Sequence, residues 1–415
     1  MNGKLGKKFW IGMLIFGLTG QIAWVVENMY FNVFIYKIFH ATASEISTMV
    51  MASAVTAALT TILLGAVSDK VGKRKAFMTA GYILWGLSII VFAYIKSVWL
   101  TIVMDCVMTF FGSTANDAAY NAWLTDKGDE SNRGLIEGFN SMMPLVSILI
   151  VFGGFMSFNL DEHSAWKTIY YIIGLVTLAI GIAGIFILED APNIKKAEET
   201  YGHILTYSFR PSTMKHNSEL YLVLLCFAVF GISIQIFMPY LIIYYEQTLK
   251  MSNYVLIMAP AIIVAAVVTA FYGKQYDRLG FKKSIVLPLA MLTAGYAILF
   301  IFKTTVPVFI GSMLMMSGYL TGMSVFGAKI RDLIPENKSG QFQGVRILGQ
   351  VFIPGLIGPA VGAAVLKNAE LIVNNDGTTS FLPHRGIWLA AALVIAALAA
   401  LLFALRKQFK CPAEI

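Results

Sequence analysis

The chain has 415 residues, of which 58% are hydrophobic and only 13% are charged, and its mean hydropathy is +0.72. Soluble domains carry about 25% charged residues, so this composition excludes a soluble, disordered or fibrous protein and predicts a polytopic helical membrane protein. Long uncharged runs argue against a transmembrane β-barrel, whose strands alternate apolar and polar residues. The net charge of +8 does not indicate nucleic acid binding, because the basic residues are scattered between apolar runs.

Twelve segments have the length of about 20 apolar residues that a membrane-spanning helix needs. In chain order they are 9–36, 46–68, 76–95, 98–125, 138–160, 168–188, 220–245, 251–273, 284–302, 304–328, 347–366 and 386–405. Ten of them contain no charged residue, whereas the first contains Glu27 and the fourth contains Asp105 and Asp117. The first run is too long for the hydrophobic region of a signal peptide, so we expect no cleavable signal.

The basic residues predict the orientation. With the N-terminus inside, 24 of the 31 lysines and arginines fall on the cytoplasmic side and seven on the outer side. This bias predicts that both termini are cytoplasmic in a cell (inner) membrane. The polar stretch 189–217 is then a cytoplasmic linker between an N-terminal half, 1–188, and a C-terminal half, 218–415.

The two halves share a loop motif. After the second span the chain reads GAVSDKVGKRK from Gly65 to Lys75, and after the eighth it reads GKQYDRLGFKK from Gly273 to Lys283, at an offset of 208 residues. The loops after the fourth and tenth spans form a second pair at an offset of 206. Parallel repeats of six spans are a recurrent transporter architecture, with the solute site where the halves meet.

The pattern Gly-x-x-x-Asp-Lys/Arg-x-Gly-x-Lys/Arg-Lys, present in both loops, resembles the signature of the major facilitator superfamily. The resemblance implies an all-α fold of twelve transmembrane helices in two six-helix pseudo-repeats, with spans one, four, seven and ten around a central cavity. It also implies that the loop residues form a conformational latch. The latch candidates are Gly65, Asp69, Gly72, Arg74, Gly273, Asp277, Arg278 and Gly280.

The glycines of the motif have an elementary physical reading. Gly65 and Gly273 allow close approach of helices, and Gly72 and Gly280 permit the tight turn that a short connector requires.

The aspartates of the motif lie at a helix end, where a carboxylate can face the N-terminus of a neighbouring helix. By the resemblance, Asp69 would face the start of span eleven near Gln341, and Asp277 the start of span five near Gly134. The alternative is that the loop only sets membrane topology, and we favour that reading for its lysines and for the side chain of Arg74.

Glu27, Asp105 and Asp117 are the candidates for ion coupling. A charged group at the bilayer centre costs about 2.5–3.5 kcal/mol even on lenient scales, so such groups indicate function. At the rise per residue of a helix, Glu27 and Asp105 share a depth on the outer side of the middle. If their faces meet, the pair is suited to carry a proton. The alternative is that each carboxylate only makes packing contacts with hydroxyl or backbone groups.

Helical periodicity places polar residues in stripes on spans one, four and seven. Amides hydrogen-bond hydroxyl groups, and aromatic faces cover the apolar surfaces of sugar rings. The alternative is a packed interface between interior helices. The candidate solute-binding residues are Gln21, Trp24 and Asn28, then Asn116, Tyr120 and Asn121, and finally Gln235 and Tyr240.

The segment from Asp117 to Trp123, DAAYNAW, resembles the fourth helix of the glycoside–pentoside–hexuronide cation symporters. The sodium users of that branch place paired aspartates on the second helix, where this chain has Ala57 and Thr61. The sequence therefore favours protons over sodium as the coupling cation.

We expect a secondary transporter for a sugar or glycoside, a single-chain membrane protein without cofactor or metal. A proton-coupled exporter of drugs or other small molecules is the alternative, and a non-transporting receptor or scaffold is a third possibility. No catalytic or nucleotide-binding motif is present, so we do not expect an enzyme.

Overall fold

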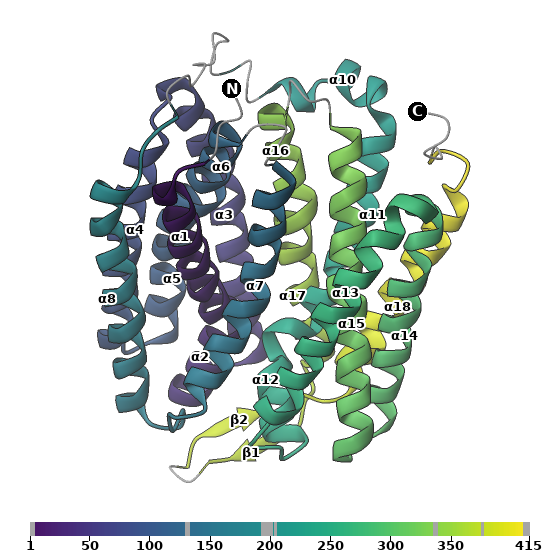
Figure 1. Ribbon diagram of the computed structural model, residues 1–415. Coiled ribbons are helices and arrows are strands. Elements are labelled where there is room, and N and C mark those ends of the chain that lie inside the picture. Colours follow the sequence, from purple (N-terminus) through teal and green to yellow (C-terminus); the bar gives the residue numbers. More distant parts are fainter. Residues whose placement is uncertain are drawn as a thin grey trace. The chain divides into compact units, whose positions relative to one another are not determined.

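A computed structural model describes residues 5–128, 133–191, 202, 206–334, 339–374 and 377–409 (Figure 1). Within this part of the chain, eleven helices are long and apolar enough to cross a membrane, and a shorter apolar helix covers Met142–Phe155. These helices confirm the all-α polytopic fold that hydropathy predicts.

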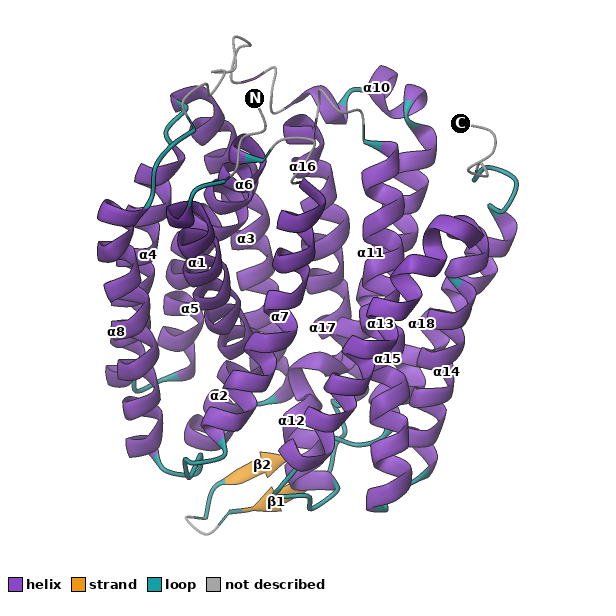
Figure 2. Ribbon diagram, in the orientation of Figure 1, coloured by secondary structure: helices purple, strands orange, loops and turns teal. Residues whose placement is uncertain are grey.

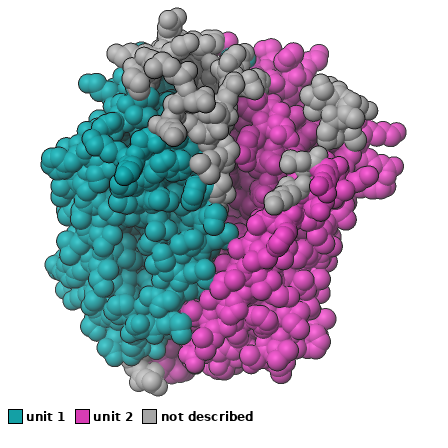
Figure 3. All heavy atoms as spheres, viewed as in Figure 1, with its two compact units in different colours: residues 1–41, 52–207 teal, residues 42–51, 208–415 magenta. Residues whose placement is uncertain are grey.

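The chain divides into two compact units, which Figure 3 colours separately. Unit 1 contains residues 1–41 and 52–207, and unit 2 contains residues 42–51 and 208–415. The helix that follows the first span is therefore shared, because its first residues belong to unit 2. The half boundaries expected from the sequence, 1–188 and 218–415, stay a prediction.

Unit 1 holds the first six spans apart from the first turns of α3, and two of these spans are interrupted by π-helical turns. Its elements are α1 (Lys7–Val25), η1 (Val26–Tyr30), α2 (Phe31–Phe39), α3 (Ala43–Val71), α4 (Arg74–Val91), η2 (Phe92–Tyr94), α5 (Val98–Gly112), η3 (Ser113–Tyr120), α6 (Asn121–Lys127), α7 (Arg133–Phe155) and α8 (His163–Ile187). Span one is continuous through α1, η1 and α2, and span four through α5, η3 and α6.

Small residues let the helices of unit 1 approach closely. A Cβ added to Gly86 on α4 would lie 2.5 Å from the backbone nitrogen of Leu178 on α8. A Cβ on Gly181 of α8 would in turn lie 2.7 Å from the nitrogen of Ile83. Such separations are below van der Waals contact, so α4 and α8 pack backbone to backbone, as small residues allow in membranes.

Unit 2 holds the last six spans and a short connector before them. Its remaining elements are η4 (Tyr207–Phe209), α10 (Pro211–His216), α11 (Ser218–Phe237), η5 (Met238–Tyr240), α12 (Leu241–Ile243), η6 (Tyr244–Thr248), α13 (Val255–Ser284), α14 (Val286–Ile301), α15 (Thr305–Leu333), α16 (Ser339–Ile347), η8 (Leu348–Phe352), α17 (Ile353–Val365), β1 (Leu371–Val373), β2 (Thr379–Phe381) and α18 (Gly386–Ala404). In unit 2, α11 packs against α17. The equivalent helices of unit 1, α1 and α7, pack against each other in the same way.

A β-hairpin connects the last two spans and was not expected from the sequence. Strands β1 and β2 pair antiparallel with Leu371 opposite Phe381 (Figure 2). The ring of Phe381 lies edge-on to that of Tyr240, with 6.1 Å between their centroids. The hairpin therefore packs against span seven, which explains an ordered structure in a segment whose length alone indicates only a loop.

Candidate functional site

The helix of span one widens into a π-helical turn at Val26–Tyr30, and Glu27 lies within that turn. Two side-chain amides bond to the backbone here. Asn28, inside the turn, donates to the backbone oxygen of Trp24 at 2.8 Å, and Asn32, after the turn, donates to the backbone oxygen of Asn28 at 2.9 Å. Turns of this kind are rare inside helices and are found frequently at functional sites. No feature of the sequence predicts this one.

Glu27 is 5% exposed and meets hydroxyl groups from two other spans. Its Oε1 lies 2.7 Å from the hydroxyl oxygen of Ser53 on α3 and 2.7 Å from that of Thr109 on α5. The two hydroxyl oxygens are 2.8 Å apart. Spans one, two and four therefore meet at one carboxyl group. Neither Ser53 nor Thr109 was among the candidate residues named from the sequence.

Asp105 is a second buried carboxyl group of unit 1, with 2% of its surface exposed. It interacts electrostatically with Glu27 and with Tyr170 on α8, so the two candidate acids are neighbours, as their common depth suggested. One oxygen of each carboxyl, Oε2 of Glu27 and Oδ1 of Asp105, is buried without a hydrogen-bond partner in the described part of the chain. Within the same part, no ion pair joins either acid to a basic side chain.

Asp117 lies on η3, the eight-residue π-helical stretch of span four. It is half-buried, and the amide of Asn121 donates to its backbone oxygen at 3.2 Å. Asp117 also interacts electrostatically with Glu27. The three candidate acids thus belong to one electrostatic system within unit 1.

Two of the predicted solute-binding residues on span four are packed inside unit 1. The hydroxyl of Tyr120 donates to the backbone oxygen of Met13 at 3.0 Å. Asn116 is 3% exposed, and its Oδ1 would lie 2.6 Å from a Cβ added to Gly20. These contacts fit the alternative reading of packed helix interfaces, while Asn121 on the same helix is exposed.

The candidates on span one are more accessible. Gln21 and Trp24 are half-buried and Asn28 is exposed. The ring of Trp24 packs against that of Trp85 with 5.5 Å between centroids, which fixes its orientation. The middle of span one therefore presents amides and an aromatic face together.

Unit 2 holds the last two candidates. Gln235 is half-buried on α11 and packs against Gly358 of α17. A Cβ added to Gly358 would lie only 2.4 Å from the Cβ of Gln235. Tyr240 is fully buried and its hydroxyl donates to the backbone oxygen of Ala43 at 2.9 Å. Tyr240 thus links span seven to the first turn of α3.

The loop after span two contains a buried arginine with acidic partners. Arg74 donates through its guanidinium to Asp69 at 2.5 Å, to Asp126 at 2.9 Å and to the hydroxyl of Ser68 at 2.7 Å. Its side chain is only 6% exposed. A role limited to membrane topology does not account for these bonds, which join α4 to the ends of α3 and α6. Neither Ser68 nor Asp126 was a candidate from the sequence.

The turn glycines of both loops have the same positive φ, 67° at Gly72 and at Gly280. A Cβ on Gly65 would lie 3.9 Å from that of Ala118, an ordinary contact, so packing does not require glycine there. Arg278 is exposed.

The remaining latch expectations fall on residues outside those that the structure describes in full. The structure does not describe the side chain of Asp277 or the surroundings of Gly273. It also does not describe the surroundings of Gln341 and Gly134, the expected partners at the helix starts. These expectations stay predictions.

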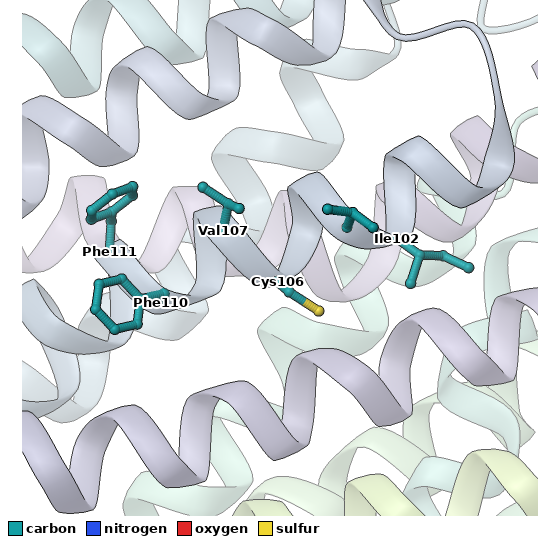
Figure 4. A pocket seen from close by; sticks show the side chains of 6 residues that line it. Ile102, Cys106, Val107, Phe110 and Phe111 are labelled. Carbon is teal, nitrogen blue, oxygen red and sulfur yellow. The ribbon is translucent and has the colours of Figure 1, made fainter.

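A hollow of about 470 Å³ lies along one face of α5. Figure 4 shows the side chains that line it along that helix. Its lining residues are Ile102, Val103, Cys106, Val107, Phe110 and Phe111. All are apolar and most are partly or fully exposed, whereas Asp105 and Thr109 lie on the buried face of the same helix. The hollow is an apolar surface depression and lacks the polar groups that a hydroxylated solute would need.

A family model described as Major Facilitator Superfamily matches residues 9–359. The chain belongs to the major facilitator superfamily. This assignment and the fold confirm the resemblance drawn from the repeated loop, and they point to a membrane transporter rather than an enzyme. The branch within the superfamily stays a prediction.

Known relatives of this major facilitator protein include Sugar efflux transporter B of Salmonella typhimurium (strain LT2), which is 23% identical over 184 residues. That match covers 43% of this chain and 46% of the relative, so it spans about half the length of each.

Solved structures resemble the whole major facilitator chain. A mutant of the nucleoside transporter NupG has a TM-score of 0.75 at 14% identity, over 97% of this chain and 100% of that one. The xylose transporter XylE of E. coli has a TM-score of 0.70 at 10% identity, over 96% and 99%. At these identities the likeness shows the fold.

Proposed function

We propose that this chain is a secondary transporter that moves a small hydroxylated solute, a sugar or a glycoside, by alternating access and in a proton-coupled manner. The observation that carries the proposal is the buried carboxyl of Glu27, held by hydroxyls from two neighbouring spans beside a second acid, Asp105. A buried acid that forms no ion pair can take up and release a proton without breaking one. Ion coupling requires such a group inside the membrane.

The proposed solute class rests on polar and aromatic side chains of both units. In unit 1, Gln21, Trp24 and Asn28 supply amides and an aromatic face within two turns of Glu27 on the same helix. In unit 2, Gln235 supplies an amide. Asn121 is the accessible amide of span four. The buried Asn116, Tyr120 and Tyr240 are proposed to support these groups by packing, because their polar atoms already have partners within their own unit.

The named relatives support the same class. One is called a sugar efflux transporter, and two resembling structures are those of a nucleoside and a xylose transporter. Sugars and nucleosides both present ring hydroxyls together with an apolar face, which amides and aromatic rings recognise.

The direction of net flux gives a second candidate. The Salmonella relative is named an efflux transporter. Export of a sugar or another small molecule in exchange for protons is therefore the alternative to symport. We further propose, from the excess of basic residues on one side, that both termini are cytoplasmic in the cell membrane. We also propose that the transporter works as a monomer, as expected from the sequence.

Proteoliposomes containing the purified chain would test the proposal. A panel of glycosides, pentoses and uronides is applied in sodium-free buffer at acidic and at alkaline pH, and substrate-triggered current and tracer uptake are recorded. A sugar-specific current that depends on pH and is absent from Glu27→Gln supports the proposal. Sugar uptake that is independent of pH removes proton coupling, and no response to any sugar by either readout removes the solute class. Currents of opposite sign distinguish symport from exchange.

A further inference from the structure

Three oxygen atoms of unit 1 form a closed triangle. Oε1 of Glu27 lies 2.7 Å from Ser53 Oγ and 2.7 Å from Thr109 Oγ1, and the two hydroxyl oxygens lie 2.8 Å from each other. Every edge has the length of an O–H···O hydrogen bond. Each edge therefore requires one proton between its two oxygens.

Counting those protons identifies the state of the carboxyl group. Each hydroxyl has one proton to donate, so Ser53 and Thr109 fill two of the three edges. If Glu27 were ionised, the third edge would hold two oxygens at hydrogen-bond distance with only lone pairs between them. We infer that Glu27 is protonated on Oε1 in this conformation, and that Ser53 and Thr109 are positioning residues which hold that proton in a cyclic array of three hydrogen bonds.

The surroundings of the triangle favour the neutral acid. Oε2 of Glu27 is buried without a partner in the described part of the chain, and an unpaired carbonyl oxygen costs less to bury than an unpaired carboxylate oxygen. Among the described residues, the titratable groups that interact electrostatically with Glu27 are Asp105, Cys106 and Asp117, all of span four. None of these three groups supplies a positive charge.

The inference rests on the proposed proton coupling and adds how the proton would act. In the neutral state the ring joins α3 to α5 through the bond between Ser53 and Thr109. When Glu27 loses its proton, both hydroxyls donate to the carboxylate and their mutual bond is lost, since neither retains a proton for it. Release of one proton thus removes a direct link between spans two and four.

A double-mutant cycle distinguishes the two states by counting bonds. In the protonated ring, Ser53→Ala or Thr109→Val each removes two of three bonds, and the double variant removes all three. The loss in thermal midpoint of the double variant should then be about three quarters of the sum of the single losses. In the ionised state each substitution removes one bond of two, so the losses should be additive. The cycle is measured on the full chain in detergent at acidic and at alkaline pH.

Matched variants show whether the effect belongs to the ring. Thr109→Ser keeps the hydroxyl and its bonds, so its loss in thermal midpoint should be small and additive with that of Ser53→Ala at both pH values. Thr114→Val removes a hydroxyl of span four that donates to the backbone oxygen of Phe110 at 2.7 Å, and it should be additive at both pH values. Additive losses at acidic pH, or equal non-additivity at both pH values, would overturn the ring.

Infrared spectroscopy tests the proton itself without any solute. The protonated carboxyl should give a C=O stretching band at neutral pH that Glu27→Gln removes and that disappears on alkaline titration. Absence of such a Glu27-dependent band would overturn the inference. Because neither measurement involves transport, a protonated ring in a protein whose transport is independent of pH would contradict the proposed coupling alone, while proton-coupled transport with an ionised Glu27 would contradict the ring alone.

Discussion

Gly72 and Gly280 lie in equivalent loops of the two units and share a positive φ of 67°. Each turns the chain between two consecutive spans, Gly72 before α4 and Gly280 within the stretch that runs from α13 towards α14. A side chain with a Cβ pays about 1–2 kcal/mol in this region of backbone space, and glycine does not. The repeated glycine therefore has a local, geometric cause in both units.

Substitution of either turn glycine should destabilise its unit. We expect Gly72→Ala and Gly280→Ala each to lower the free energy of unfolding by about 1–2 kcal/mol. Asparagine should not restore stability at Gly280, because φ of 67° and ψ of 170° lie in a backbone region that is essentially restricted to glycine. Thermal unfolding of the purified variants measures the effect. Gly153→Ala is the matched control, since a Cβ there meets nothing within 4 Å and should leave stability unchanged or raised. Equal stability of Gly72→Ala and wild type would contradict the strain argument.

Arg74 should matter for stability more than the lysines around it. Its guanidinium holds Asp69, Asp126 and Ser68 at once, so Arg74→Met leaves two carboxylates without their counter-charge and should cost about 3 kcal/mol of folding free energy. Arg74→Lys should recover only part, because an ammonium lacks the planar fork that spans two acceptors.

The neighbouring Lys73 is exposed and provides the control. Lys73→Gln should change the thermal midpoint little, since single exposed charges contribute little. Similar midpoints for Arg74→Met and Lys73→Gln would show that Arg74 contributes only its positive charge to the loop, and that its specific bonds do not stabilise the fold.

Asp69 carries the proposed latch. Asp69→Asn leaves Arg74 bonded to Asp126 and Ser68, so we expect a small loss of stability. We expect it to slow turnover several-fold without changing the affinity for solute. Initial rates of tracer uptake over a range of solute concentrations separate the two quantities. A large loss of affinity at normal turnover would contradict the latch.

Glu27→Gln should abolish proton-driven accumulation and spare solute binding. The amide cannot release a proton, whereas the solute contacts proposed for Gln21 and Trp24 are untouched. Accumulation against a gradient and equilibrium binding are measured on the same preparation. Asp105→Asn is the comparison, because Asp105 is the neighbouring buried acid: accumulation lost in Asp105→Asn and retained in Glu27→Gln would move the coupling role to Asp105.

A buried ion pair of unit 2 should stabilise the joint between spans seven and ten. Nζ of Lys329 lies 2.7 Å from Oε1 of Glu219, with side chains 5% and 15% exposed. Lys329→Met should cost about 3 kcal/mol, because it removes a buried positive charge that pairs with Glu219. The double variant with Glu219→Gln should recover part of that loss in thermal unfolding, and Lys215→Gln, an exposed site, should change little. A double variant as unstable as the single one would contradict the pairing.

The sequence by itself determined the membrane class, the all-α fold and the superfamily. Hydropathy needs only the length of an apolar run, because each helix satisfies its own backbone in lipid. The positive-φ turns at Gly72 and Gly280 were likewise predictable, since a short connector between two helices requires such a residue wherever it occurs. The candidate acids stood out because charge inside an apolar run is costly in any arrangement.

Only the tertiary structure decided which groups meet. That Ser53 and Thr109 converge on Glu27, that Arg74 bridges Asp69 and Asp126, and that Tyr120 bonds the backbone of Met13 depend on how helices rotate and pack against one another. The π-helical turn at Glu27 and the hairpin of β1 and β2 have the same origin. Periodicity assigns a residue to a face of its own helix, but the partner across that face comes from packing between segments far apart in the chain.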